Sequence, residues 1–324
     1  MNGKLILSVD LLQCPVTGCP LEEIDGELAT VDGRRRYHVI DGVPILLPEE
    51  LSIFSGADSY DHAVGAGRTR RVRHVVRRLL PGNSPLIGTA GRFVHFRQEL
   101  LRRTAGRPSM VLVIGGGILG AGMSVLADST DVELIETDVY LGPRVSVVCD
   151  GHDLPFIPET FDGVIVQAVL EHVLDPQRVI REIHRVLRPG GLVYAETPFM
   201  QQVHEGAYDF TRWTELGHRR LFRMFKEIDR GISAGPGTVL LWSLCYLARS
   251  IPRRSSSIQL LLEKLTLLTF FWLKHVDRLV VTHVGAIDGA SGVFFMGSKA
   301  EQPIDDAELL AGYRGSIGRP IRMG

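Results

Sequence analysis

Apolar stretches of strand length alternate with stretches of helix length over the middle of the chain. The apolar stretches are Val111–Ile114, Val132–Ile135, Val145–Cys149, Gly163–Gln167 and Gly191–Glu196. Continuous apolar runs are typical of strands buried on both faces, and their alternation with helices predicts a parallel sheet with helices on either side. A ligand of such a sheet binds beyond the carboxyl ends of its strands. We therefore expect an α/β domain with its site at that edge.

Apolar and polar positions alternate in shorter runs within the first 50 residues. The runs are Glu27–Thr30, Arg36–Ile40 and Val43–Leu47, with Asp32-Gly33 and Asp41-Gly42 between them. Asp-Gly between alternating runs is a strong signal for a β-hairpin. Residues 1–50 are therefore predicted to form a small β module.

An arginine-rich segment follows this module. We expect residues 51–67 to be a linker, and residues 68–103 contain ten arginines with Glu99 as their one acid. Arg70, Arg73 and Arg77 recur at helical spacing with apolar residues between them, which predicts an amphipathic helix. Its arginines form either a solvated helix face or a surface that contacts phosphate groups or a membrane.

Residues 237–284 are unusually apolar and predict two helices. Leu, Trp and Phe occupy nearly every face of both, so the helices either pack together, form a dimer contact, or are buried in a membrane surface or against a hydrophobic acceptor. The longest apolar stretch, from Ile258 to Leu273, is interrupted by Glu263 and Lys264 and falls short of a spanning helix of about 20 residues. Residues 301–324 are expected to be a tail in which Tyr313 docks locally.

Composition narrows the class of protein. With 324 residues the chain exceeds one average domain, and 45% hydrophobic with 23% charged residues excludes a mostly disordered chain. Lys and Arg number 36 against 37 Asp and Glu, so the net charge of −1 favours no particular partner. Four cysteines are too few for a disulfide scaffold, and the N-terminus lacks the pattern of a signal peptide. We expect a cytoplasmic protein, membrane-associated if the apolar helices contact lipid.

A glycine-rich loop directly follows the first predicted strand of the sheet. Its glycines are Gly115, Gly116, Gly117 and Gly120. Glycine allows a sharp turn and a close approach to a ligand, and the N-terminus of the following helix offers N–H groups. Glu136 and Asp138 follow Gly115 by 21 and 23 positions, where an acid binds ribose hydroxyls. Because NAD and S-adenosylmethionine both contain ribose, this loop alone does not choose between them.

Four motifs in residues 147–198 make that choice. D-x-x-x-L-P-F, F-D-x-V, L-E-H and R-V-L-x-P-G-G occur here in order. With them the sequence resembles the class I S-adenosylmethionine-dependent methyltransferases over about residues 85–225. The resemblance implies a Rossmann-like, doubly wound, mostly parallel sheet that an antiparallel last strand at Ser291–Ser298 completes. It places a methyltransferase domain at residues 106–300, after a linker and Arg-rich segment at 51–105, with residues 237–284 as a helical insertion.

The resemblance also implies roles for individual residues. Glu136 takes the ribose of S-adenosylmethionine, with Asp138 nearby. Asp150 takes the adenine amino group beside the backbone of Gly151 and His152, and Gln167 with Ala168 lines the methionine end. The alternatives are a surface acid for Glu136 and a turn or helix cap for Asp150. Leu119 stands where the family has its third glycine, and Val113 where an acid is common, so the cofactor's amino group needs another partner.

Residues 197–222 carry the candidates for proton transfer: His204, Glu205, Tyr208, Asp209, Arg212 and His218. Methyl transfer to a hydroxyl oxygen requires the reacting groups about 3 Å apart and a base for the proton. Histidine suits that role near neutral pH, so His204 is our candidate base, with Asp209 or Tyr208 beside it. The alternative is a loop histidine that only caps or packs. We expect no metal site, because no cluster with metal-ligand spacing is evident.

The first 50 residues resemble a small zinc-ribbon-like domain known as an activator of tRNA and protein methyltransferases. The match consists of the knuckle CPVTGC and the ending Y-x-V-x-D-G-V-P-I-L-L-P. A tetrahedral zinc site needs four ligands, but Cys14 and Cys19 are the only cysteines here and Gly33–Arg36 occupies the second knuckle position. His38 alone does not complete a site, so we expect no structural zinc.

Together these features predict an S-adenosylmethionine-dependent methyltransferase of a small-molecule, sugar or lipid-linked hydroxyl. A tRNA or rRNA methyltransferase is the enzymatic alternative, because of the arginines and the activator-like module. The altered glycine loop keeps open a cofactor-binding partner subunit without catalysis. A homodimer or a peripheral membrane contact would use the apolar helices.

Overall fold

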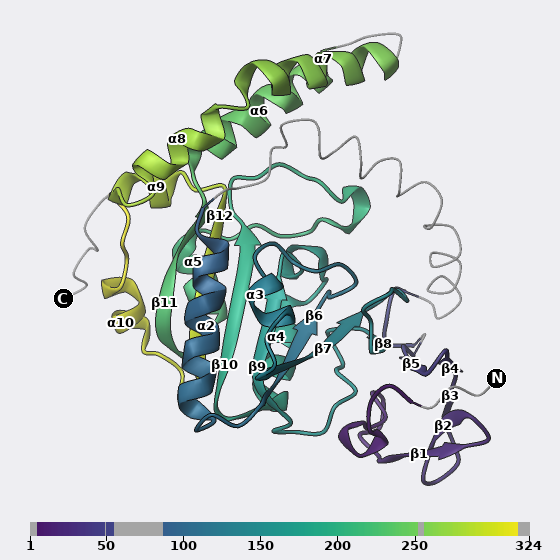
Figure 1. The fold of residues 1–324 in the computed structure, drawn as a ribbon. Helices are drawn as coiled ribbons and strands as arrows, with labels where there is room; N and C mark the ends of the chain where they lie inside the picture. Colours follow the sequence, from purple (N-terminus) through teal and green to yellow (C-terminus); the bar gives the residue numbers. More distant parts are fainter. Residues whose placement is uncertain (1–4, 49, 55–86, 252–255, 317–324) are drawn as a thin grey trace.

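The computed structural model describes residues 5–48, 50–54, 87–251 and 256–316. The predicted helix around Arg70, Arg73 and Arg77 lies outside these residues. Within them, a large sheet with helices on both faces forms the body of the molecule (Figure 1). No helix in the described ranges combines the length and apolarity needed to cross a membrane.

The large sheet has nine strands. They are β4 (Val39–Ile40), β5 (Val43–Leu46), β6 (Ser109–Ile114), β7 (Val132–Asp138), β8 (Val147–Cys149), β9 (Phe161–Gln167), β10 (Leu187–Pro198), β11 (Phe225–Ala234) and β12 (Gly292–Lys299). Their spatial order is β11-β12-β10-β9-β6-β7-β8-β5-β4. The run from β10 to β5 is parallel, and β12 lies antiparallel between β10 and β11. This confirms the Rossmann-like, mostly parallel sheet with an antiparallel last strand.

The order of the strands fixes where a ligand can bind. From β6 the chain moves outward through β7 and β8, and it then returns to the other side of β6 to form β9 and β10. A crevice opens at the carboxyl ends of the strands where the winding reverses. That switch point lies between β6 and β9.

Helices cover both faces of the sheet because each presents one apolar stripe to it. On one face, Phe93, Phe96 and Leu100 of α2 (Thr89–Arg103) pack with Leu126 of α3 (Ser124–Ala127). On the other face α4 (Pro176–Val186) buries four apolar side chains, and α5 (Glu215–Leu221) contacts β12. Asp175 caps α4 by accepting the N–H of Arg178, and Pro176 stands at its first position.

The N-terminal residues are joined to the large sheet. β1 (Leu21–Ile24), β2 (Glu27–Thr30) and β3 (Arg36–Tyr37) form a small antiparallel sheet. Asp41 and Gly42 connect β4 to β5 with positive φ angles of 51° and 83°, as a two-residue hairpin turn requires. β5 then pairs in parallel with β8. The predicted β strands are therefore present, and β4 and β5 extend the large sheet.

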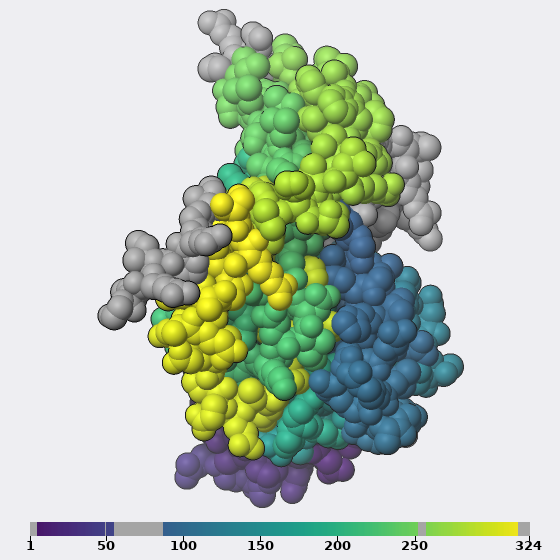
Figure 2. Space-filling model, turned by 90° about the vertical axis from the view of Figure 1, so that its left-hand side faces the viewer, coloured from purple at the N-terminus to yellow at the C-terminus, as the bar shows by residue number. Residues whose placement is uncertain are grey.

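A helical arm leaves the body between β11 and β12. It consists of α6 (Pro236–Ser250), α7 (Ser256–Phe270) and α8 (Leu273–Val280), and α9 (Val284–Asp288) leads back to the sheet. The arm runs along the top of Figure 1, and in Figure 2 it stands clear of the sheet-containing body. In the predicted tail, α10 (Asp306–Ala311) packs near α5, and the Tyr313 hydroxyl donates to Asp288.

Candidate active site

A cavity of about 780 Å³ lies at the switch point of the sheet. Among the residues that line it are Gly115, Gly117, Asp138, Asp150, Gly151, His152, Ala168, His204 and Tyr208. All of these were predicted as site residues. A cavity of this size is large enough for a cofactor-sized ligand.

The glycine loop forms one wall of this cavity. Gly115 has a φ of 74°, and a Cβ atom at this position would lie 2.4 Å from the Val169 side chain. The N–H of Gly117 donates to Asp138 Oδ2 at 3.0 Å. A larger residue at either glycine would therefore displace the wall of the cavity. Gly116 and Gly120 support the loop from below and are not among the lining residues.

The two predicted ribose ligands have different surroundings. Asp138 ends β7 and lines the cavity. Glu136 is 4% exposed, does not line the cavity, and pairs with Arg144 at 2.7 Å. The reason is that β7 continues to Asp138, past the predicted strand end at Ile135, so Glu136 lies beneath Gly116. Of the two predicted ribose ligands, Asp138 therefore lines the cavity and Glu136 does not.

Asp150 follows β8 and is held by three hydrogen bonds. Its carboxylate accepts from Ser52 Oγ at 2.5 Å, from the His152 N–H at 3.0 Å and from His152 Nδ1 at 2.5 Å. Burial alone would raise the pKa of this carboxyl, but these bonds outweigh it and hold the pKa below its usual value. Asp150 is therefore an ionised acceptor in the cavity wall.

A segment of the N-terminal part reaches over the cavity. Ser52 bonds Asp150, and the Phe54 ring stacks on Tyr208 with centroids 5.6 Å apart and meets Tyr140 edge-on at 5.7 Å. Phe54, Tyr140 and Tyr208 thus form an aromatic cover on the cavity. Ser52 and Phe54 were predicted to belong to a linker. No local sequence pattern marks them, because their place at the cavity depends on contacts with residues far along the chain.

Gln167 and Ala168, the two residues predicted for the methionine end, have different places at the end of β9. Ala168 lines the cavity with a positive φ of 55°, which is unusual for a residue with a side chain. Gln167 points beneath the glycine loop, where its Nε2 donates to Glu196 at 2.9 Å and to the Ala121 carbonyl at 3.3 Å. Gln167 therefore supports the loop, and Ala168 remains in the lining.

The acceptor side of the cavity is formed by His204 and its neighbours. The His204 N–H donates to Asp209 Oδ2 at 2.8 Å, and His204 Nδ1 lies 3.4 Å from the same oxygen. Arg212 donates to both oxygens of Asp209, which holds the pKa of that carboxyl well below its usual value. The predicted partnership of His204 with Asp209 is therefore present, and Tyr208 and Glu205 line the same side. His218 is buried in α5 and lines no part of this cavity.

A buried carboxyl group lies behind His204. Glu171 Oε1 is 3.7 Å from His172 Nε2 and 4.0 Å from His204 Nε2, and Glu171 is 1% exposed. Burial raises the pKa of Glu171 to about 8 and lowers the pKa of His172. His172 Nδ1 donates to the Tyr208 carbonyl at 2.7 Å, which leaves Nε2 facing Glu171. Near neutral pH these groups form a protonated carboxyl beside a neutral imidazole.

The ligand atoms of Glu171, His172 and His204 lie within 4.8 Å of one another. One carboxylate and two imidazoles are a set that divalent cations use. This cluster was not predicted from the sequence, because His204 lies 32 positions after His172 and the fold brings the two together. A carboxyl group beside two imidazoles is also suited to proton transfer. The residue types of this cluster therefore do not by themselves assign it to a metal.

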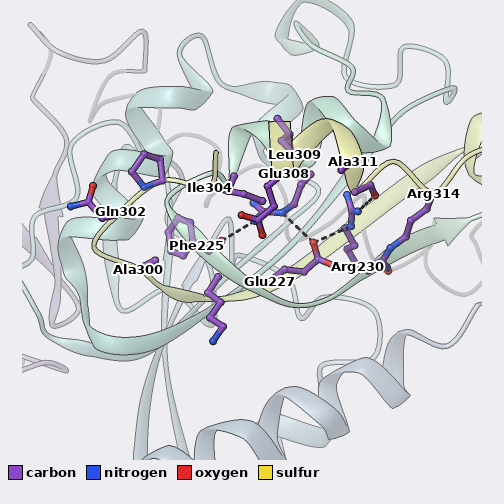
Figure 3. Close-up of a pocket in the computed structure, with 14 residues that line it drawn as sticks. Phe225, Glu227, Arg230, Ala300, Gln302, Ile304, Glu308, Leu309, Ala311 and Arg314 are labelled. Carbon is purple, nitrogen blue, oxygen red and sulfur yellow. Dashed lines mark hydrogen bonds and ion pairs between the residues drawn. The ribbon is translucent and has the colours of Figure 1, made fainter. Parts of the chain in front are cut away.

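A second hollow of about 780 Å³ lies between β11 and the segment that contains α10. Figure 3 shows its charged side chains turned toward one another. Glu227 accepts from Arg219 at 3.2 Å and pairs with Arg230 at 3.1 Å and Arg314 at 2.6 Å. No predicted site residue lines this hollow. The cavity at the switch point is therefore our candidate active site.

The N-terminal cysteines contact protein groups. The Cys14 N–H donates to the Cys19 carbonyl at 2.8 Å, and the buried Cys14 Sγ lies 3.1 Å from the Tyr37 hydroxyl. Both cysteines are reduced. The expectation that this knuckle holds no zinc remains a prediction.

Comparisons with known proteins define the class of the domain. Residues 119–195 match the family model described as a methyltransferase domain. The ubiquinone biosynthesis O-methyltransferase of Pseudomonas syringae pv. tomato is 36% identical over 104 residues, which cover 29% of this chain and 45% of that protein. The demethylmenaquinone methyltransferase of Paenarthrobacter aurescens is 29% identical over 133 residues, covering 40% of this chain and 47% of that protein.

The chain thus spans less than half the length of these two curated relatives. Among solved structures, a 1,6-didemethyltoxoflavin-N1-methyltransferase of Burkholderia thailandensis is 16% identical with a TM-score of 0.40, over 84% of this chain and 98% of that one. Residues 119–195 are thus similar to a methyltransferase domain, and the sheet around them has the Rossmann-like α/β order.

Proposed function

We propose that the chain is an S-adenosylmethionine-dependent methyltransferase that methylates a hydroxyl of a small-molecule, sugar or lipid-linked acceptor. The observation that carries this proposal is a single cavity that has a glycine loop and two acids on one side and His204 on the other. The match of residues 119–195 to a methyltransferase domain supports it.

The donor half of the proposal uses residues around the ends of β6, β7 and β8. Asp138 accepts from the ribose hydroxyls, and Asp150 accepts from the adenine amino group. The small residues Gly115 and Ala168 leave room for the methionine part, and Phe54 with Tyr140 covers the adenosine part. When bound, S-adenosylmethionine supplies an activated methyl group on a sulfonium.

The acceptor half uses His204 as general base. His204 Nε2 would accept the proton of the acceptor hydroxyl when that oxygen takes the methyl group that the donor supplies. Asp209 lies beside His204 Nδ1 and stabilises the imidazolium that results. Arg212 keeps Asp209 ionised and in place.

The relatives support a small-molecule acceptor. The names of these relatives refer to O-methylation in ubiquinone biosynthesis and to methylation of demethylmenaquinone. The aligned segments cover 29% and 40% of this chain, so the acceptor of this chain is part of the proposal.

Calorimetric titration with S-adenosylmethionine tests the donor half. We expect binding by the native protein and a loss of about tenfold to a hundredfold in affinity for Asp138→Asn, since a hydrogen bond to a charged group contributes about 1.5–3 kcal/mol. Glu136→Gln is the matched control, because it removes a nearby carboxylate outside the cavity. Absence of binding by folded native protein, or equal losses in both variants, would contradict the proposal.

A further inference from the structure

The arm formed by α6, α7 and α8 exposes large apolar side chains along its length. The residues are Leu240, Leu247, Ile258, Leu260, Leu261, Leu265, Leu268, Trp272 and Leu279, each at least 45% exposed. Figure 2 shows these helices projecting beyond the rest of the body. So many large apolar side chains exposed on one projecting element are rare on a soluble monomer and mark an interaction site.

The arm is fixed in this position at its base. The buried Asp277 carboxylate of α8 accepts the N–H groups of Gly235, Gly237 and Thr238 and the Thr238 hydroxyl, at 2.6–3.1 Å. These bonds satisfy the N-terminal N–H groups of α6 and place a negative charge at the positive end of its dipole. The hydrogen bonds between α8 and the start of α6 therefore fix the position of the arm that carries the exposed apolar side chains.

The charge of the arm differs from that of the chain. Residues 236–283 contain six Lys and Arg and two Asp and Glu, a net +4, whereas the whole chain carries −1. Of the two acids, Asp277 is buried and Glu263 pairs with Arg249 at 3.6 Å. Lys264 lies exposed between Leu261 and Leu265. Of the cations in the described part of the arm, Lys274 is buried, and Lys264 and Arg278 place positive charge beside the exposed apolar side chains.

The inner side of the arm contacts the acceptor side of the cavity. Gln202 Nε2 donates to Ser243 Oγ at 2.9 Å, and the Tyr246 hydroxyl donates to the Val203 carbonyl. The ring of Trp242 lies 6.4 Å from that of His204, edge to face. The base of the arm at α6 is therefore packed beside the candidate base.

We propose that the arm docks on the surface of an anionic lipid bilayer and so presents the acceptor side of the cavity to that surface. Exposed leucines enter the interface, Trp272 lies at its polar boundary, and the lysine and arginine side chains meet anionic headgroups. A second copy of the chain fits less well, because its arm would bring the same net positive charge against this one. That the methyl acceptor is itself an amphiphile in the bilayer rests on the proposed function; the docking does not.

Vesicle flotation tests this inference on the full chain. We expect the native protein to float with vesicles of phosphatidylcholine and phosphatidylglycerol, and to bind pure phosphatidylcholine more weakly. Leu261→Glu with Leu265→Glu should lower the affinity for the anionic vesicles about tenfold or more, since two leucines lose their apolar contact. Lys264→Glu should lower it by a smaller factor that shrinks as salt is added.

The matched control is Ile24→Glu with Val31→Glu, which changes two exposed apolar residues of the N-terminal part. It should float like the native protein. Equal binding by the Leu261/Leu265 variant would overturn the proposal. The proposal would also be overturned if the native protein did not float and light scattering showed it to be a dimer that the Leu261/Leu265 variant dissociates. Donor affinity measured on each variant checks its fold, and flotation without donor binding would reject the proposed function but keep the docking.

Discussion

His204 is the side chain on which the proposed chemistry depends most directly. Its Nδ1 lies 3.4 Å from Asp209 Oδ2, its Nε2 lies 4.0 Å from Glu171 Oε1, and the residue lines the cavity. We expect His204→Ala to lower kcat about 10²–10⁴-fold, the usual contribution of general base catalysis, with donor affinity unchanged. Methyl-transfer assays with an acceptor that the native protein methylates would measure this, and added imidazole should restore part of the rate.

Glu205→Gln is the control for His204→Ala, because Glu205 lines the same side and is exposed. It should keep nearly native kcat. A His204→Ala variant with native kcat would contradict the assignment of the base.

Glu171 makes the stability of the fold depend on pH. Its pKa is about 8 in the fold against an ordinary 4.5, so the unfolded chain loses this proton at lower pH than the fold does. Below about pH 4.5 the group is protonated in both states, and stability falls as the pH rises from there to about 8. Glu171→Gln should remove this fall, which is on the order of a few kcal/mol at most.

Urea unfolding at pH 5 and pH 8, with a metal chelator present, would measure this difference for the native chain and Glu171→Gln. The variant should gain on the native protein as the pH rises. A difference that stays the same at both pH values would show that Glu171 is not the group responsible.

Single residues were predictable from the sequence where a motif fixes them. Gly115, Gly117, Asp150 and His204 were found in this way and line the cavity. The choice between Glu136 and Asp138 was not predictable, because it depends on how far β7 extends. Ser52, Phe54 and Glu171 were missed, since burial and distant contacts give them their place at the site.

At the scale of elements, the joint between α8 and α6 sets the direction of the arm. Asp277→Ala removes four hydrogen bonds and leaves the start of α6 without an acceptor. We expect a loss of about 2–3 kcal/mol in the free energy of unfolding of the native chain. Urea denaturation would measure it, and hydrogen exchange should show faster exchange confined to α6–α8.

Asp305→Ala is the comparison for Asp277→Ala, because Asp305 caps α10 with one hydrogen bond in an exposed place. Its cost should be smaller. An equal cost for the two substitutions would mean that the joint at Asp277 is an ordinary cap.

The pattern of apolar positions predicted most elements of the sheet. The predicted parallel strands agree with β6–β10, and Ser291–Ser298 agrees with β12. Asp32-Gly33 lies between β2 and β3, and Asp41-Gly42 lies between β4 and β5. β11 was not predicted, because its sequence FKEIDRGISA carries charges that pair with α5 and the C-terminal segment. The hairpin at Asp25-Gly26 was also missed, although its dipeptide signal was present.

At the scale of the whole molecule, the N-terminal residues and the cavity depend on each other. Deletion of residues 1–54 removes β4, β5 and the Ser52 and Phe54 contacts, and it exposes the edge of β8. We expect a lower Tm, aggregation and weaker donor binding, measured by thermal unfolding and calorimetry.

Phe54→Ala in the intact chain is the control, and it should weaken donor binding with little change in Tm. A deleted chain with native Tm and affinity would contradict this dependence.

The pairing of β5 with β8 has a consequence for how the protein responds to dilution. Strand addition between two separate chains would be governed by their concentrations and would fail when either became scarce. Here the added strand is tethered to the sheet by its own backbone, so its effective concentration is fixed by chain length. Specific activity should therefore stay constant as the protein is diluted, and no outside strand can compete for that edge while β5 occupies it.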